Sequence, residues 1–153
     1  MNTKIYLLIF SALFISQLTF GQTQPAVKEH RKSILKSHKS IKQKTSAIGN
    51  DTVSLKKKQQ HSKQIGKELS NAQSREDSLY NGMNASQKAS LKKHHDSIQS
   101  KHKKAAEHHK ALEKELAKPQ PDPAKVKEYN DSLQKTIDEA NKEYEDEKYP
   151  EVF

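Results

Sequence analysis

Large apolar side chains are scarce after residue 21, and their scarcity limits the folds open to this sequence. Residues 22–153 contain only 24 apolar side chains larger than alanine among 132 residues. The chain also has 31% charged residues and a formal net charge of +9. A low apolar content with a high net charge is typical of disordered chains. We therefore expect no compact monomer with a sizeable core, and disorder stays an open alternative for residues 22–80.

The positions of proline and glycine nevertheless favour helices. The chain has only four glycines, its prolines lie at Pro25, in the segment 119–123 and at Pro150, and helix-forming residues fill the intervals. We expect an all-α fold of about four extended amphipathic helices, arranged as a helical hairpin or in a coiled-coil-like manner. The expected helices cover residues 25–47, 52–81, 85–118 and 123–149, with Asn50 or Asp51 capping the second and Asp122 capping the fourth.

The first 21 residues have the pattern of a secretory signal peptide. Lys4 precedes an apolar run over residues 5–15, and small Gly21 ends the segment. The run is shorter than the roughly 20 residues that a membrane helix needs. We expect cleavage between Gly21 and Gln22 and a periplasmic or secreted product. The expected organisation is a signal peptide (1–21), a basic helical region (22–81) and a helical hairpin region (82–149) with a proline-rich turn at 119–123.

Charge and export narrow the classes of partner. Residues 22–118 hold 22 basic against 9 acidic side chains, whereas residues 119–153 hold 5 against 10. The acidic last helix can therefore fold back on the basic ones. Because an exported protein meets little DNA or RNA, we expect no nucleic-acid partner, and anionic lipid, lipopolysaccharide or acidic protein segments fit better. The absence of cysteine excludes disulfides as a source of stability.

Three of the expected helices carry an apolar stripe at helical spacing. The last has the clearest one, formed by Val126, Tyr129, Leu133, Ile137, Ala140 and Tyr144. The third has a heptad seam of Leu91, His95, Ile98, His102, Ala105, His109, Leu112 and Leu116. The first has a similar seam of Val27, Arg31, Ile34, His38, Ile41, Thr45 and Ile48. If the seam histidines of the third helix pack neutral against a partner helix, burial lowers their pKa and acid weakens the association.

The same histidines are also candidate metal ligands. They are seven residues apart, or roughly 10 Å along a helix, which is too far for one ion. His109 with Glu113 is the one pair at i,i+4. We therefore expect no cofactor beyond weak zinc or copper binding, within one chain or between chains, for which the candidate ligands are His109, Glu113, His102 and His95.

Catalysis has little support in the sequence. His94, Asp96 and Ser97 supply the residue types of a catalytic triad. Neighbours on a helix are, however, turned by about 100° from one another, so these side chains point in different directions. No phosphate-binding glycine loop or metalloprotease motif is present. We expect the protein not to be an enzyme.

A short motif opens the third expected helix. Met83 precedes Asn84, and Gln87 follows three residues later, which predicts a reciprocal capping box. This segment resembles the Leu-Thr-x-x-Gln signature of the Spy/CpxP family, small exported helical proteins of the envelope stress response, with Met83 and Asn84 in place of Leu and Thr. The resemblance covers about residues 83–147. It implies a curved helical dimer that shields unfolded proteins without ATP.

The expected function is holdase-like binding of unfolded or envelope proteins in the periplasm, with a homodimer as the expected assembly. Apolar contact with the client is assigned to Leu91, Ile98, Leu112 and Leu116. Long-range attraction is assigned to Lys92, Lys93, Lys101, Lys103 and Lys104. Two alternatives stay open: a basic helical envelope protein that lies on anionic lipid or lipopolysaccharide, and a histidine-rich protein that buffers metal ions.

Overall fold

A computed structural model describes residues 24–145 of the protein, and within this range the secondary structure is entirely helical. The helices are α2 (Gln24–Ile48), α3 (Leu55–Asn81), α4 (Ala85–Leu116) and α5 (Pro123–Glu145). The predicted all-α fold is confirmed. The expected signal peptide and its cleavage position lie outside the described residues.

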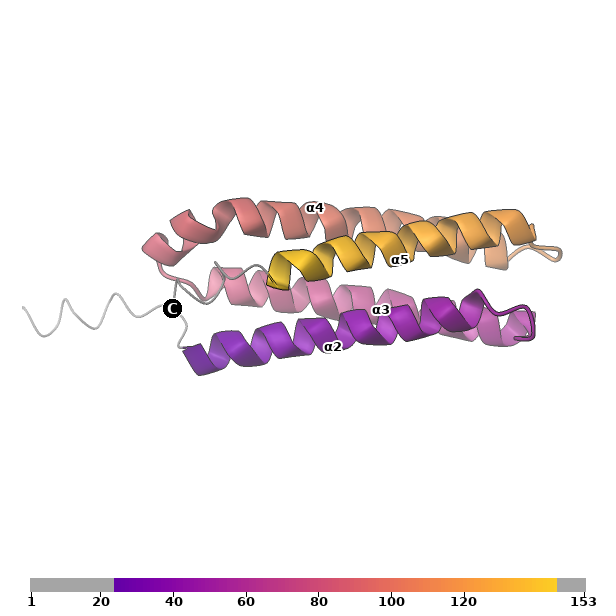
Figure 1. The fold of residues 1–153 in the computed structure, drawn as a ribbon, viewed down its shortest axis with the longest axis horizontal. Coiled ribbons are helices and arrows are strands. Elements are labelled where there is room, and N and C mark those ends of the chain that lie inside the picture. Colours follow the sequence, from indigo (N-terminus) through magenta and orange to yellow (C-terminus); the bar gives the residue numbers. More distant parts are fainter. Residues whose placement is uncertain (1–23, 146–153) are drawn as a thin grey trace, which may run out of the picture.

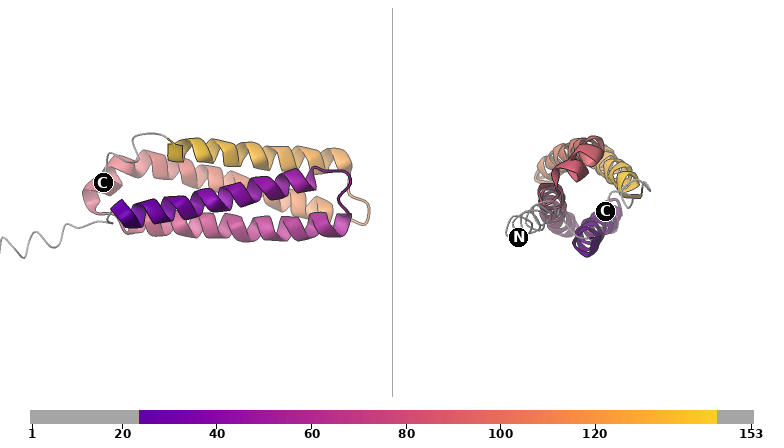
Figure 2. Two further views of the ribbon diagram at one scale, coloured as in Figure 1. Left: turned by 60° about the horizontal axis from the view of Figure 1, so that its bottom comes forward. Right: turned by 90° about the vertical axis from the view of Figure 1, so that its left-hand side faces the viewer.

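The four helices form an elongated antiparallel bundle (Figure 1). α2 packs against α3 and α5, and α4 packs against the same two helices, so α2 and α4 face each other diagonally across the core. The end-on view shows the helices arranged around a common axis (Figure 2). Residues 49–54 and 117–122 connect helices at one end, called here the two-loop end, and residues 82–84 connect them at the other, the one-loop end. Between residues 24 and 145, no helix has the length and apolar character needed to cross a membrane.

Local chemistry accounts for where the helices begin. The side chain of Asn84 accepts a hydrogen bond from the Gln87 amide at 2.9 Å, and the Gln87 side chain accepts one from the Asn84 amide at 3.0 Å. At the start of α5, Asp122 Oδ1 accepts from the Ala124 amide at 2.9 Å. The predicted cap of the second helix is wrong: its N-cap is Ser54. Asn50 Oδ1 instead accepts from the amide and hydroxyl of Thr52 and closes the preceding turn.

Nearly all the large apolar side chains point into the bundle. Of the 21 that lie in the described range, 16 are buried, and Leu55 is the single exposed large hydrophobic residue there. They form two clusters. The cluster toward the two-loop end consists of Ile41, Ile48, Ile65, Leu69, Ala105, Leu112, Leu116, Val126, Leu133 and Ile137. The cluster toward the one-loop end consists of Val27, Ile34, Ala72, Leu79, Met83, Leu91, Ile98 and Tyr144.

The expectation that a compact monomer is improbable is therefore wrong for residues 24–145. It counted only apolar side chains as core. The structure also buries ten polar or charged residues, including His38, Glu76, His102 and His109, and most of their polar atoms have partners across the bundle. A buried polar side chain with its hydrogen bonds made fills interior space without the full cost of desolvation. The inner faces of the helices, which mix polar and apolar residues, thus pack against one another within a single chain.

Candidate functional site

A pair of histidines lies in the core between the two apolar clusters. His38 of α2 and His102 of α4 are 0% and 2% exposed. Their Nε2 atoms are 3.0 Å apart, so the two rings meet head-on across the diagonal of the bundle. On the other side of the His38 ring, Nδ1 lies 2.7 Å from Oδ1 of Asn141 in α5. One polar layer therefore connects three of the four helices.

With both rings neutral, the hydrogen bonds of this layer fix where its protons lie. Because the Asn141 oxygen can only accept, His38 Nδ1 carries a hydrogen and donates to it. In a neutral His38 ring, Nε2 is then the acceptor, and His102 Nε2–H donates to it. His102 Nδ1 is left without a hydrogen, and it is buried with no hydrogen-bond partner. One proton is shared between the two facing nitrogens, and both rings are neutral.

Burial explains why the pair resists protonation. Loss of hydration, together with the smaller effect of nearby His38 as a potential like charge, lowers the pKa of His102 to about 3. Burial also lowers the pKa of His38, although its hydrogen bond with Asn141 opposes the shift. Both histidines are therefore uncharged at neutral pH.

A second buried network lies toward the one-loop end and centres on a carboxylate. Glu76 of α3 is 0% exposed. The Tyr144 hydroxyl of α5 donates to its Oε2 at 2.6 Å, and His95 Nδ1 of α4 lies 3.0 Å from its Oε1. The ring of Tyr80 stacks on His95 with centroids 3.8 Å apart. The Tyr144 ring also contacts His38, at 5.9 Å between centroids, so the two polar networks adjoin.

His109 makes a different kind of contact toward the two-loop end. Its Nε2–H donates to the backbone carbonyl of Ser62 at 2.7 Å. The ring lies so close to Gly66 that a Cβ built there would be 2.9 Å from His109 Cε1. Gly66, which weakens the helix signal in the sequence, is thus the residue that lets α3 and this ring approach each other.

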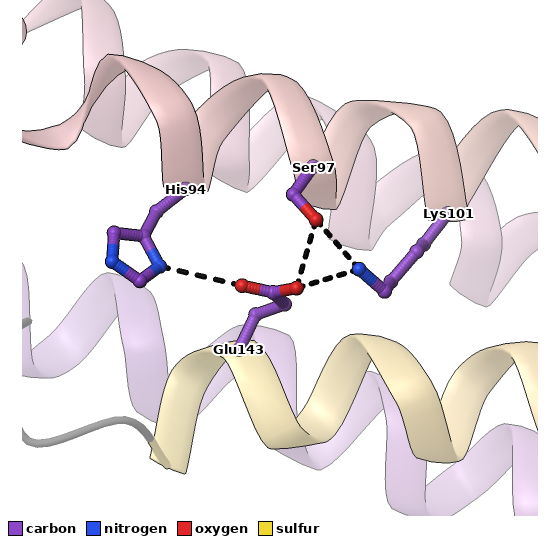
Figure 3. Close-up of polar contacts among 4 residues, drawn as sticks. All are labelled: His94, Ser97, Lys101 and Glu143. Carbon is purple, nitrogen blue, oxygen red and sulfur yellow. Dashed lines mark hydrogen bonds and ion pairs between the residues drawn. The ribbon is translucent and has the colours of Figure 1, made fainter.

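A partly exposed cluster ties α4 to α5 (Figure 3). The Glu143 carboxylate accepts hydrogen bonds from Ser97 Oγ at 2.8 Å and Lys101 Nζ at 2.6 Å, and His94 Nδ1 lies 3.3 Å from its other oxygen. Burial pushes the pKa of Glu143 up, but the hydrogen bonds from Lys101 and Ser97 outweigh this effect and lower it. Ser97 Oγ also accepts from Lys101 Nζ at 2.6 Å, so the four side chains form one hydrogen-bonded cluster between α4 and α5.

The outer surface of the bundle is unevenly charged. α2 carries seven basic and one acidic residue, α3 six and three, and α4 eight and four, whereas α5 carries four and six. Two of the acids of α5 are ion-paired with neighbouring helices, through Lys42–Asp138 and Lys101–Glu143. The exposed lysines of α2, α3 and α4 form what we call the basic surface: Lys28, Lys32, Lys36, Lys39, Lys56, Lys57, Lys63, Lys67, Lys92, Lys93, Lys103, Lys104, Lys110 and Lys114.

The structure separates the residues that the sequence assigned to client binding. Leu91, Ile98, Leu112 and Leu116 are all at most 2% exposed and belong to the core. In this conformation they are closed to a client, because the other three helices cover them. Of the lysines, Lys92, Lys93, Lys103 and Lys104 are exposed, and Lys101 is paired with Glu143.

The candidate metal ligands do not converge on one point. His102 contacts His38, His95 contacts Glu76, and His109 contacts Ser62, while Glu113 is exposed. In the range 24–145, no group of three or more histidine, aspartate or glutamate side chains is placed to hold a metal ion. The described residues thus assemble no metal centre from these candidates.

One buried member of the polar networks, Glu76, was missed in the sequence, as was the pairing of His38 with His102. Glu76 belongs to a seam of α3 in which the steps are three and four residues: Ser62, Ile65, Leu69, Ala72, Glu76 and Leu79 are all buried. The same count that found the other seams would have placed Glu76 inside. No sequence signal pairs His38 with His102, because they lie 64 residues apart on helices that are diagonal in the bundle.

The two-loop end has a groove of about 640 Å³. Its lining includes core residues Ile48, Leu116 and Val126, the exposed Leu55 and the side chain of Lys58. It contains Leu55, the single large hydrophobic side chain in the described range that is exposed.

The chain matches no protein-family model, no curated protein sequence and no solved structure. The resemblance to the Spy/CpxP family therefore stays a prediction.

Proposed function

We propose that this is an exported, non-enzymatic bundle protein that binds anionic envelope surfaces, lipid or lipopolysaccharide, through its basic surface. The observation that carries the proposal is the contrast on the outside of the bundle. α2, α3 and α4 expose lysines along their lengths, whereas Leu55 is the single exposed large hydrophobic residue between 24 and 145. A closed bundle of this kind offers charge to a partner and almost no apolar area.

Electrostatics gives the proposal a magnitude. Each lysine near an anionic membrane contributes about 1 kcal/mol of attraction, and the field decays within a Debye length of about 10 Å at 0.1 M salt. Several lysines acting together therefore give the bundle a measurable affinity for an anionic membrane at low salt. We expect the attraction to weaken steeply as the salt concentration rises.

Co-sedimentation with vesicles tests this. The mature protein should bind vesicles containing phosphatidylglycerol at low salt, release them at a few tenths molar salt, and ignore purely zwitterionic vesicles. The variant that replaces Lys92, Lys93, Lys103 and Lys104 with Gln should bind more weakly than its matched control, which replaces Lys125, Lys127, Lys135 and Lys142 of α5. A parallel arm with lipopolysaccharide distinguishes the two anionic sources. Equal binding to zwitterionic vesicles, or equal losses in the two variants, would contradict the proposal.

Holdase-like client binding, which the sequence favoured, is the second candidate. It is supported by the half-polar interior, in which His38, Glu76 and His102 interrupt the apolar seams. Because less apolar area is buried per helix, such a bundle opens more readily than an all-apolar one, and opening uncovers the seam of α4. The resemblance of residues 83–147 to the Spy/CpxP family favours this second candidate.

Aggregation of an unfolded client, followed by light scattering, tests the second candidate. The closed bundle should give little protection at pH 7, and protection should grow under conditions that open it. No protection at several-fold molar excess, with the bundle either closed or opened, would rule it out.

A further inference from the structure

We propose that the His38–His102 pair is an acid-sensitive latch: while both rings are neutral it joins α2 to α4 across the core, and protonation of the pair opens the bundle. This inference concerns the fold itself and holds whatever the basic surface binds.

The geometry permits only one proton between the two rings. The Nε2 atoms face each other at 3.0 Å, so a second proton would set two N–H donors against each other with no acceptor between them. Protonating His102 at Nδ1 instead would place an N–H where the described residues supply no acceptor, since that atom is buried and without a hydrogen-bond partner. Either route puts a charge into the core without a hydrogen bond to hold it.

The neighbouring helices do not supply a counter-charge. From α5, Asn141 and the Tyr144 ring contact His38, and both are uncharged. From α3, two carboxylates lie near this layer and both have other partners: Glu76 accepts from Tyr144 and contacts His95 of α4, and Glu68 accepts from Ser37 and Ser40 of α2. Among residues 24–145, no hydrogen bond or ion pair joins a carboxylate to either ring of the pair. A charged latch thus has no buried partner that would keep the bundle closed.

His109 is an internal comparison for this argument. It is also a histidine on the inner face of α4, seven residues from His102, but its Nε2–H donates to the Ser62 carbonyl. That bond is kept when the ring gains a proton, because the donor stays a donor. Burial alone does not make the latch, and the head-on pairing of two titratable rings does.

Opening at this layer would uncover apolar side chains on both diagonal helices. Ile34 and Ile41 flank His38 on the inner face of α2, and Ile98 and Ala105 flank His102 on α4. Protonation of the pair would thereby expose the apolar residues on the inner faces of α2 and α4. If the second candidate function is correct, the same event exposes its client-binding face.

The test is urea unfolding, followed by far-UV circular dichroism, at several pH values between 6.5 and 5. In this window unfolded histidines gain protons while ordinary carboxylates stay ionised, so the histidine contribution is isolated. Each histidine that is neutral when folded should lower the folding equilibrium constant by up to about tenfold per pH unit. The double variant His38→Leu/His102→Leu should lose this dependence, and the control variant His109→Leu should keep it. Equal pH slopes for the wild type and the double variant would overturn the proposal.

A second measurement does not depend on any variant folding. NMR of the ring Cε1–H signals follows each of the eight histidines in the intact chain. We expect the His102 signal to stay at its neutral position in the folded state down to pH 5, and the His38 signal to titrate below the ordinary pH of about 6.5. If both titrate in the folded state at the ordinary pH of about 6.5, the latch does not exist.

Discussion

The two ends of the bundle satisfy their buried histidines in different ways. Toward the two-loop end, His109 donates to the backbone carbonyl of Ser62 at 2.7 Å, as Asn130 Nδ2 does to that of Thr45 at 3.0 Å, while buried Glu115 accepts from Lys118 and the Asp122 amide. In the middle and toward the one-loop end the partners are other side chains, as in the His38–His102 pair at 3.0 Å.

This difference determines how each end responds to acid. A backbone carbonyl accepts hydrogen bonds over the whole pH range. An imidazole or a carboxylate gains a proton in acid, and the protonated atom can then no longer accept a hydrogen bond. Two equally buried histidines thus have different consequences for stability. The partner of a buried polar group, rather than its burial alone, determines whether the group is a fixed support or a switch.

The largest effect is expected from removing apolar packing at the two-loop end. Ile41→Ala should lower the free energy of unfolding by about 2–5 kcal/mol, because the side chain is fully buried and leaves a cavity. Leu55→Ala, at the exposed residue of the same end, is the control and should cost less than about 1 kcal/mol. Chemical denaturation at pH 7 measures both. Equal costs would contradict the packing described for this cluster.

A smaller effect is expected in the network of the one-loop end. Tyr144→Phe removes the hydroxyl that donates to buried Glu76 and should cost about 1–3 kcal/mol, because the carboxylate loses a partner that water does not replace. Tyr129→Phe is the matched control on the same helix, since Tyr129 is only partly buried. The same denaturation assay compares them. A Tyr144→Phe variant as stable as its control would show that the Glu76 network contributes nothing.

The Glu143 cluster should contribute at most about 1 kcal/mol, because its carboxylate and Lys101 are partly exposed to water. The pKa of Glu143 is lower in the folded state than in the unfolded one, so its contribution is complete above about pH 4.5 and is lost as the pH falls through the folded value. Glu143→Gln should therefore reduce stability at pH 6 more than at pH 3. A deficit that grows on acidification would have the wrong sign.

The smallest net effect is expected at Gly66. Alanine is favoured over glycine in a helix by about 1 kcal/mol, but its Cβ would be 2.9 Å from the His109 ring, which must move. We expect Gly66→Ala to change stability by less than about 1 kcal/mol in the wild type. In the His109→Ala background, where the ring is gone, the same substitution should stabilise. No difference between the two backgrounds would show that the ring and Gly66 do not interact.

Much of the fold follows from local signals in the sequence. The helix expected over residues 85–118 is found at Ala85–Leu116, because Asn84 caps its start and the proline-rich turn ends it. The inner faces of three helices were also predictable, since their apolar residues recur every three or four positions. The start of α3 was not, because Ser54 begins the helix without a side-chain hydrogen bond.

The candidate site was less predictable, because it depends on how the helices are aligned along one another. Which residue of α2 meets which residue of α4 depends on two loops and on the packing of α3 and α5 between them. His38 and His102 were both visible as seam residues, but nothing local aligns them. The same limit applied to Leu91 and Ile98, whose exposure depends on whether the seams close on each other.

Hydrogen exchange, read by mass spectrometry at pH 6.5 and pH 5 and corrected for intrinsic rates, tests the difference between the two ends most directly. We predict that protection falls first and furthest in the segments around His38, Glu76 and His102, while residues 45–48 and 109–116 near the two-loop end keep theirs. Uniform loss of protection, or earlier loss at the two-loop end, would contradict the account.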